Sequence, residues 1–151
     1  MHITIDTREQ TPLKFIGVET SSKKIDFGDY SCILSDGHVV PVVFERKSVC
    51  DLFGTMSVGY ERFRNEINRC KESNFKMIII IEGVLTKVSK GISHSCRSGD
   101  SVLSQLFTIW IKYDITPVFC KDQEESSKFI TLFYTAFEKK YWVEKNSTLT
   151  K

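Results

Sequence analysis

The sequence predicts an α/β domain with a central β-sheet flanked by helices. Short apolar segments alternate along the chain with longer segments whose apolar residues recur at helical spacing. One short segment, KMIIIIE at residues 76–82, is apolar almost throughout, as expected of a central strand buried on both faces. The length of 151 residues suits one domain with a substantial core.

Five strands are expected from their apolar and β-branched residues. They are placed at residues 2–6, 30–34, 39–45, 76–82 and 116–120. The second and third are predicted to form a hairpin, because Asp36-Gly37 between them is a turn signal.

Three helices are expected at residues 57–72, 101–112 and 123–141. A further helix should begin at Ser48, which is a suitable N-cap with Asp51 at the third helical position. Asp122 and Glu125 form a plausible capping pair for the last helix. We therefore assign residues 1–142 to one domain and expect 143–151 to be a frayed C-terminal tail.

Composition restricts the class of protein only loosely. The net charge of +2 neither demands nor excludes a nucleic-acid partner. The five cysteines are scattered without a CxxC pair, so we expect no disulfide framework or zinc site, and a reduced intracellular setting. The cytoplasm, nucleus and infected-cell interior are not distinguished. Neither a signal peptide nor a membrane span is expected, and His94 with Cys96 is too small a set for a metal site.

The charged end of the strand at 39–45 is the main candidate for chemistry. Because side chains alternate along a strand, Glu45 and Lys47 share one face and Arg46 points to the other. A carboxylate can bind a hard divalent cation, and an ammonium beside it can orient an attacking water and offset phosphate charge.

A second acid would be needed to hold a cation, and Asp29 is the best candidate. A two-residue turn at Asp36-Gly37 would put Asp29 across from Phe44, and Glu45 would lie on the opposite face. A three-residue loop would put Asp29 across from Glu45. The hypothesis therefore requires an odd-length loop, or a bulge near Gly28 or Pro41.

Other acids have two interpretations each. Asp51 can cap the helix or support the site, and Asp6 with Glu9 can either join the acidic cluster or form a polar turn.

Several motifs resemble the XPF nuclease family. GDY at 28–30 followed by FERKSVCDL at 44–52 is similar to the GD…ERKxxxD signature of that family. IDTRE at 5–9, GYERFRNEI at 59–67 and MIIIIEG at 77–83 resemble its first strand, a helix and a central strand. The resemblance covers roughly residues 2–140, and every motif position carries the catalytic residue type.

The resemblance implies a restriction-endonuclease-like fold and an Mg²⁺- or Mn²⁺-dependent endonuclease that cuts DNA at flapped, forked or branched sites. By position, Asp29 and Glu45 would bind metal, and Lys47 would position the water. Asp6 and Glu9 would complete the acidic cluster. The remaining catalytic positions are Arg46 and Asp51, which would brace the site or contact phosphate.

Unlike eukaryotic and archaeal members, this chain has no helix-hairpin-helix module or helicase domain, so it looks like the standalone bacterial or phage type. More of the DNA contact would then fall on local basic groups. These candidates are Arg8, Arg62, Arg64, Arg69, Lys87, Lys90 and Arg97. Arg62, Glu66 and Arg69 also fit a solvated helix face with paired charges.

The last helix has more large apolar residues than one face needs, which indicates either a homodimer through the C-terminal helices or a thick monomer core. For function, a DNA endonuclease is the main hypothesis. The alternatives are a catalytically silent dimerisation or DNA-binding module of the same fold, and a phosphodiesterase acting on RNA or small nucleotides.

Overall fold

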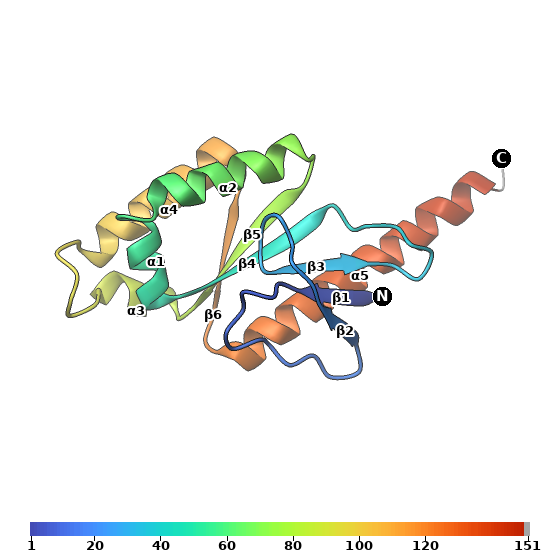
Figure 1. Cartoon of the computed structure of the whole chain (residues 1–151), viewed down its shortest axis with the longest axis horizontal. Helices are drawn as coiled ribbons and strands as arrows, with labels where there is room; N and C mark the ends of the chain where they lie inside the picture. The colour runs from blue at the N-terminus through green and yellow to red at the C-terminus, as the bar shows by residue number, and fades with distance from the viewer. Residues whose placement is uncertain (150–151) are drawn as a thin grey trace.

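A mixed six-stranded sheet forms the centre of the molecule, in a computed structural model that describes residues 1–149 (Figure 1). The strands are β1 (His2–Ile5), β2 (Glu19–Ser22), β3 (Tyr30–Ile33), β4 (Val42–Ser48), β5 (Lys76–Glu82) and β6 (Thr116–Cys120). The helices are α1 (Val49–Thr55), α2 (Tyr60–Glu72), α3 (Leu85–Lys90), α4 (Gly99–Tyr113) and α5 (Gln123–Leu149). The strand order is β2-β1-β3-β4-β5-β6, which confirms the predicted sheet with flanking helices.

The sheet separates two apolar cores. Helices α1, α2 and α4 cover one face, where they pack on alternate residues of β4 and β5 such as Val43 and Ile79. Helix α5 covers the other face and packs on Phe44 and Ile80. Figure 1 shows α5 lying across the sheet on the opposite side from α2 and α4. Burial on both faces explains why β5 reads as a continuous apolar run.

Strand β4 continues to Ser48, three residues beyond the predicted end at Glu45. It pairs in parallel with β5 along its whole length, from Val42 opposite Lys76 to Ser48 opposite Glu82. Ladder hydrogen bonds therefore hold the charged end of β4 in extended conformation. The predicted alternation holds, so Glu45 and Lys47 face the α1–α2 side and Arg46 faces the α5 side.

In the hairpin between β3 and β4, even-numbered residues pair with even-numbered residues and odd-numbered residues with odd-numbered ones. Ile33 pairs with Val39, and inside that pair the Leu34 N–H donates to the His38 carbonyl, which leaves a three-residue loop at 35–37. Further along, Tyr30 pairs with Phe44. From the first pair to the second, the β3 side advances three residues and the other side advances five, so two extra residues are accommodated around Pro41. Tyr30 and Phe44 face the α5 side together, so Asp29 and Glu45, the next residues along each segment, fall on the other side. The metal-site hypothesis required either an odd-length loop or a bulge near Gly28 or Pro41. The structure has both an odd-length loop and extra residues near Pro41.

A buried tyrosine supports this bulge. The hydroxyl of Tyr134, on α5, donates to the carbonyl oxygen of Val42 at 2.9 Å and lies 3.3 Å from that of Tyr30. The side chain is fully buried and packs edge-on against Phe44. Helix α5 thereby supplies a donor where the extra residues interrupt the ladder.

Four features differ from the sequence predictions. Strand β2 was not predicted, because its residues are polar and exposed and it pairs only with β1 at the sheet edge. Helix α3 lies between the strand expected at 76–82 and the helix expected at 101–112, where no helix was predicted. Helix α2 begins at Tyr60 rather than at 57, because residues 56–59 form a turn. Helix α5 continues to Leu149, so residues 143–149 are helical rather than a frayed tail. Residues 150–151 lie outside the described part of the chain.

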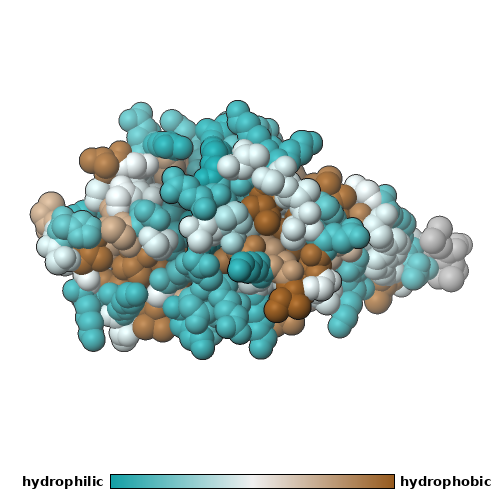
Figure 2. Space-filling model, turned by 60° about the horizontal axis from the view of Figure 1, so that its bottom comes forward, coloured by the Kyte–Doolittle hydropathy of each residue, from teal (hydrophilic) through white to brown (hydrophobic). Residues whose placement is uncertain are grey.

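Most large apolar side chains of α5 are used within the chain. Phe129, Phe133, Phe137 and Tyr141 pack onto the second core. The hairpin loop also contacts the helix, because Asp36 accepts hydrogen bonds from the Tyr141 hydroxyl at 2.7 Å and from another α5 side chain. These contacts account for much of the apolar surface of α5 within the chain, and Leu132 on the same helix remains 59% exposed. Figure 2 shows apolar patches interrupted by hydrophilic side chains on the face it presents. No helix within residues 1–149 is long and apolar enough to cross a membrane.

Candidate active site

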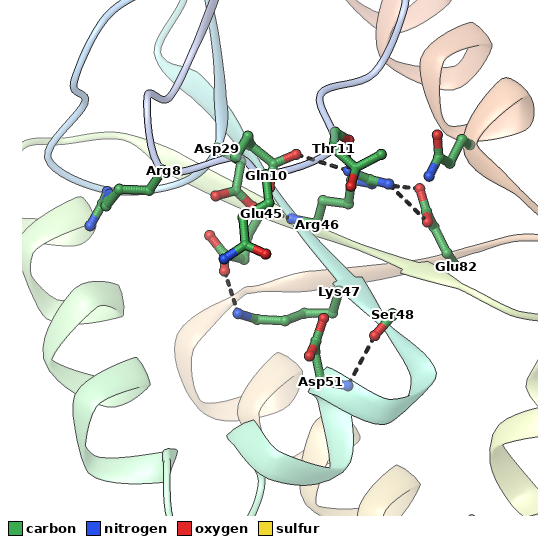
Figure 3. A pocket seen from close by; sticks show the side chains of 12 residues that line it. Arg8, Gln10, Thr11, Asp29, Glu45, Arg46, Lys47, Ser48, Asp51 and Glu82 are labelled. Atoms are coloured by element: carbon green, nitrogen blue, oxygen red, sulfur yellow. Dashed lines mark hydrogen bonds and ion pairs between the residues drawn. The ribbon is translucent and has the colours of Figure 1, made fainter.

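Two adjoining pockets open at the charged end of β4. The pocket on the α5 side has a volume of about 490 Å³ and the pocket on the α2 side about 460 Å³. Five residues line both, namely Arg8, Asp29, Glu45, Lys47 and Asp51. The structure therefore brings together most of the residues predicted for the site, and Figure 3 shows their side chains gathered around the end of the strand.

Glu45 and Lys47 form the centre of the cleft. Lys47 Nζ lies 2.7 Å from Glu45 Oε1, and the ammonium also lies over the Phe63 ring at 5.8 Å from its centroid. Asp29 Oδ2 accepts a hydrogen bond of 2.7 Å from the backbone N–H of Arg46. Strand β4 thus positions both acids. Glu45 is one of its own residues, and Asp29 is held by a backbone N–H of the strand.

The two carboxyl groups repel each other in a poorly solvated place. Burial raises the pKa of Glu45, and the nearby charge of Asp29 raises it further. Burial also raises the pKa of Asp29, against the opposing hydrogen bond from the Arg46 N–H. Burial acts to lower the pKa of Lys47, but the charge and hydrogen bond of Glu45, together with the charges of Asp29 and Glu66, outweigh it and the pKa is raised. One buried and one half-buried acid, both with raised pKa values, suit a bound cation, which would stabilise both charges.

The donor set fits Mg²⁺ or Mn²⁺ more closely than zinc. Both acids are oxygen donors, and no group of three or more His, Cys, Asp or Glu side chains within residues 1–149 is arranged to enclose an ion. Mg²⁺ commonly binds through one or two carboxylates and keeps several waters or substrate phosphate oxygens. Asp29 and Glu45 would supply such a pair.

Arg46 lies on the α5 side of the strand and braces the cleft wall. Its guanidinium donates to Glu82 at 2.6 and 3.2 Å, to Glu9 at 2.9 Å, and to the carbonyl of Thr11 at 2.7 Å. Glu9 also accepts a hydrogen bond of 2.5 Å from the Tyr30 hydroxyl. Glu9 lines only the α5-side pocket, so it belongs to this network rather than to the group around Glu45.

Asp6 is not among the residues that line either pocket. Its buried carboxylate accepts hydrogen bonds from the Arg8 side chain at 2.8 and 3.0 Å, from the Arg8 N–H and from the Ile25 N–H. Burial acts to raise the pKa of Asp6, but these hydrogen bonds outweigh it and the pKa is lowered. Asp6 therefore holds Arg8 in place at the rim of the cleft.

The start of α1 forms another part of the wall. Ser48 accepts a hydrogen bond of 3.0 Å from the Asp51 N–H, which confirms the predicted N-cap and leaves the Asp51 carboxylate exposed in both pockets. His94 contacts the start of α1, where its Nε2 lies 3.2 Å from the thiol of Cys50.

Some of the candidate DNA-contacting residues lie in the cleft and others lie outside it. Only Arg8 and Arg62 line the cleft. Arg97 is partly buried and its guanidinium is engaged within the protein, by the carbonyls of Met56 and Ser101 and by Gln105. The other candidates, Arg64, Arg69, Lys87 and Lys90, are exposed and line neither pocket.

Sequence reasoning missed Glu66 on α2 and Glu82 at the end of β5. Glu82 is the main partner of Arg46. Glu66 lines the α2-side pocket, and its carboxylate accepts a hydrogen bond of 2.9 Å from the Gly28 N–H. Its spacing was an available signal, because Glu66 follows Phe63 by three residues and precedes Cys70 by four, on the buried stripe of the helix.

The fold and the cleft define a protein with the restriction-endonuclease-like fold of XPF nucleases. The sequence profile of the ERCC4 domain matches residues 5–133, and the chain belongs to the ERCC4 domain family. XPF from Aeropyrum pernix superposes with a TM-score of 0.69 at 20% identity, covering 96% of this chain and 69% of that one. Its complex with DNA gives a TM-score of 0.68 at 22% identity, with 91% and 65% coverage. The chain thus spans about two thirds of these proteins. No curated protein sequence matches it.

Proposed function

We propose that this protein is a divalent-metal-dependent DNA endonuclease that hydrolyses phosphodiester bonds at flapped, forked or branched sites. One observation carries the proposal. The half-buried Asp29 and the buried Glu45 line the same open cleft, with Lys47 Nζ at 2.7 Å from Glu45. Membership of the ERCC4 domain family, and the likeness to a structure of XPF in complex with DNA, support the assignment to DNA.

Asp29 and Glu45 would hold Mg²⁺ or Mn²⁺, which would polarise the phosphoryl oxygen and lower the pKa of a bound water. Lys47 is placed to orient that water and to offset the charge that develops on the phosphate, since its ammonium is fixed by Glu45 and packed on Phe63. Arg46 takes no direct part in this scheme, because its guanidinium is directed to the α5 side and is occupied there.

We assign phosphate contacts near the cut to Arg8 and Arg62, which line the same pocket. Arg8 is half exposed and fixed by Asp6, while Arg62 projects from α2 into the same pocket. Both are guanidinium groups, which suit bidentate phosphate contacts. Their removal should weaken DNA binding at low salt more than it changes the metal requirement.

A homodimer is part of the proposal. Trp110 and Ile111 on α4 are 42% and 86% exposed, and Leu132 on α5 is 59% exposed. Exposed apolar side chains on the last two long helices suit an interface between copies. The mass in solution, measured by light scattering for the wild-type protein and for Ile111→Glu, tests this part separately.

The test of activity uses purified protein with duplex, single-stranded, flapped and forked DNA, each with Mg²⁺, Mn²⁺ or EDTA. Lys47→Ala and Glu45→Ala should each lower cleavage at least about 100-fold. Lys76→Ala, which removes an exposed lysine at the far end of β5, serves as the control and should cleave normally. Cleavage that survives both site variants would refute the assignment. RNA and a cyclic dinucleotide are run in parallel, because cleavage of these alone would favour the other substrate classes.

A further inference from the structure

Glu66 connects helix α2 to the acidic site through one hydrogen bond. The carboxylate reaches from the inward stripe of the helix and accepts the Gly28 N–H at 2.9 Å, across 38 positions in the sequence. It lines the α2-side pocket together with Asp29, Glu45 and Lys47. The side chain is half-buried and lies between the buried Phe63 and Ile67 of the same helix.

The backbone that Glu66 contacts is tightly constrained. Gly28 has a positive φ of 73°, and a Cβ at this position would lie 3.1 Å from both the Phe44 carbonyl oxygen and the Val43 Cβ. The next residue, Asp29, donates its N–H to the Phe44 carbonyl at 2.7 Å. The turn at residues 28–29 therefore lies directly on β4, and its orientation decides where the Asp29 carboxylate points.

We propose that Glu66 is a positioning residue, which holds the Gly28 N–H so that the Asp29 carboxylate stays in the cleft beside Glu45 and the two bind a divalent cation together. This inference rests on the proposed function, because it deepens the account of the same site. Glu66 acts through the backbone of Gly28 and does not ligate the ion. The geometry favours this role, because the acceptor oxygen is occupied by the N–H and no three acidic side chains within residues 1–149 surround one point.

Substitution can separate the hydrogen bond from the charge. Glu66→Gln keeps a carbonyl oxygen at the same reach and removes the charge, whereas Glu66→Asp keeps the charge and shortens the side chain by one carbon. A positioning role predicts that the glutamine variant resembles wild type and the aspartate variant does not. A ligand role predicts the reverse order.

The experiment measures Mn²⁺ binding directly, by electron paramagnetic resonance of the free ion and by titration calorimetry, in the absence of DNA. Loss of a supporting contact typically weakens metal binding about 10- to 100-fold, so we expect that loss for Glu66→Asp and Glu66→Ala, and a change within about threefold for Glu66→Gln. Glu72→Ala removes an exposed acid from the end of the same helix and should bind Mn²⁺ as wild type does. Circular dichroism of each variant checks folding, and if Glu66→Ala does not fold, the comparison of Gln with Asp decides.

The proposal is overturned if Glu66→Asp binds Mn²⁺ like wild type, or if Glu66→Gln binds as weakly as Glu66→Asp. A wild-type protein that binds Mn²⁺ but cuts no nucleic acid would refute the proposed function and still allow the test of Glu66. A wild-type protein that binds no Mn²⁺ would overturn both.

Discussion

Replacing Arg46 by Met should destabilise the protein strongly although it leaves the acids at the centre of the cleft untouched. The guanidinium joins Glu82 at 2.6 Å and Glu9 at 2.9 Å, with all three side chains only 11–14% exposed. Methionine would leave two poorly solvated carboxylates facing each other without a cation. Breaking a buried pair typically costs 3–5 kcal/mol, and because these groups keep some access to water we expect about 3 kcal/mol.

Urea denaturation followed by circular dichroism measures this loss, and a fall in Tm of about 6–12 °C should accompany it in a domain of this size. Lys76→Met is the matched control. It removes the cation from an ion pair at 2.9 Å with Asp114, but those side chains are 50% and 69% exposed, so the expected cost is below about 1 kcal/mol.

A double variant isolates the cause of the effect. If the loss comes from the unpaired acids, Arg46→Met combined with Glu82→Gln should recover at least about 1 kcal/mol relative to Arg46→Met alone. The reasoning is refuted if Arg46→Met costs no more than Lys76→Met, because the Arg46 network would then contribute no more than an exposed pair does.

Three other perturbations test separate parts of the structure. Gly28→Ala should cost at least about 2 kcal/mol in urea denaturation, because it combines a positive φ with a crowded Cβ, whereas Gly37→Ala has the positive φ with open space around it and should cost about 1 kcal/mol. The pKa values of Asp29 and Glu45 are raised in the folded state, so the metal-free folded protein binds these protons more tightly than the unfolded chain does. Its free energy of unfolding should therefore fall as the pH rises above about 4. Glu45→Gln should flatten this decline, and a steeper decline in that variant would contradict the reasoning. Tyr134→Phe removes the donor at the β4 bulge and should cost about 1–3 kcal/mol, whereas an unchanged unfolding midpoint would show that the bulge does not need it.

The buried elements could be predicted from sequence and the exposed ones could not. The strands at 76–82 and 116–120 have the predicted bounds, because apolar residues fill them and turn residues delimit them. Strand β2 carries the sequence ETSS, which has no apolar residue, and it exists only because β1 offers an edge for parallel pairing. Local patterns do not record a partner of that kind.

The candidate site likewise contains features that a local sequence pattern predicts and features that depend on contacts between distant parts of the chain. Alternation along one strand was enough to place Glu45 and Lys47 on one face. The turn signal left the position of Asp29 open between two loop lengths, and the pairing of Tyr30 with Phe44 in the structure decides it. Contacts that need distant parts of the chain were not foreseen. The pairing of Cys50 with His94 spans 44 positions, and the contact of Glu66 with Gly28 spans 38.

The number of residues in the β3–β4 hairpin decides which face of the sheet each β4 side chain occupies. This limits how the region can change in length. Deleting one residue between Val39 and Val43 would rotate the rest of β4 by one pleat, turn Arg46 toward α2 and put Glu45 and Lys47 against α5. Deleting two would remove the bulge and leave every side chain on its present face. Related or engineered chains that retain the acidic pair should therefore gain or lose residues in this hairpin in twos.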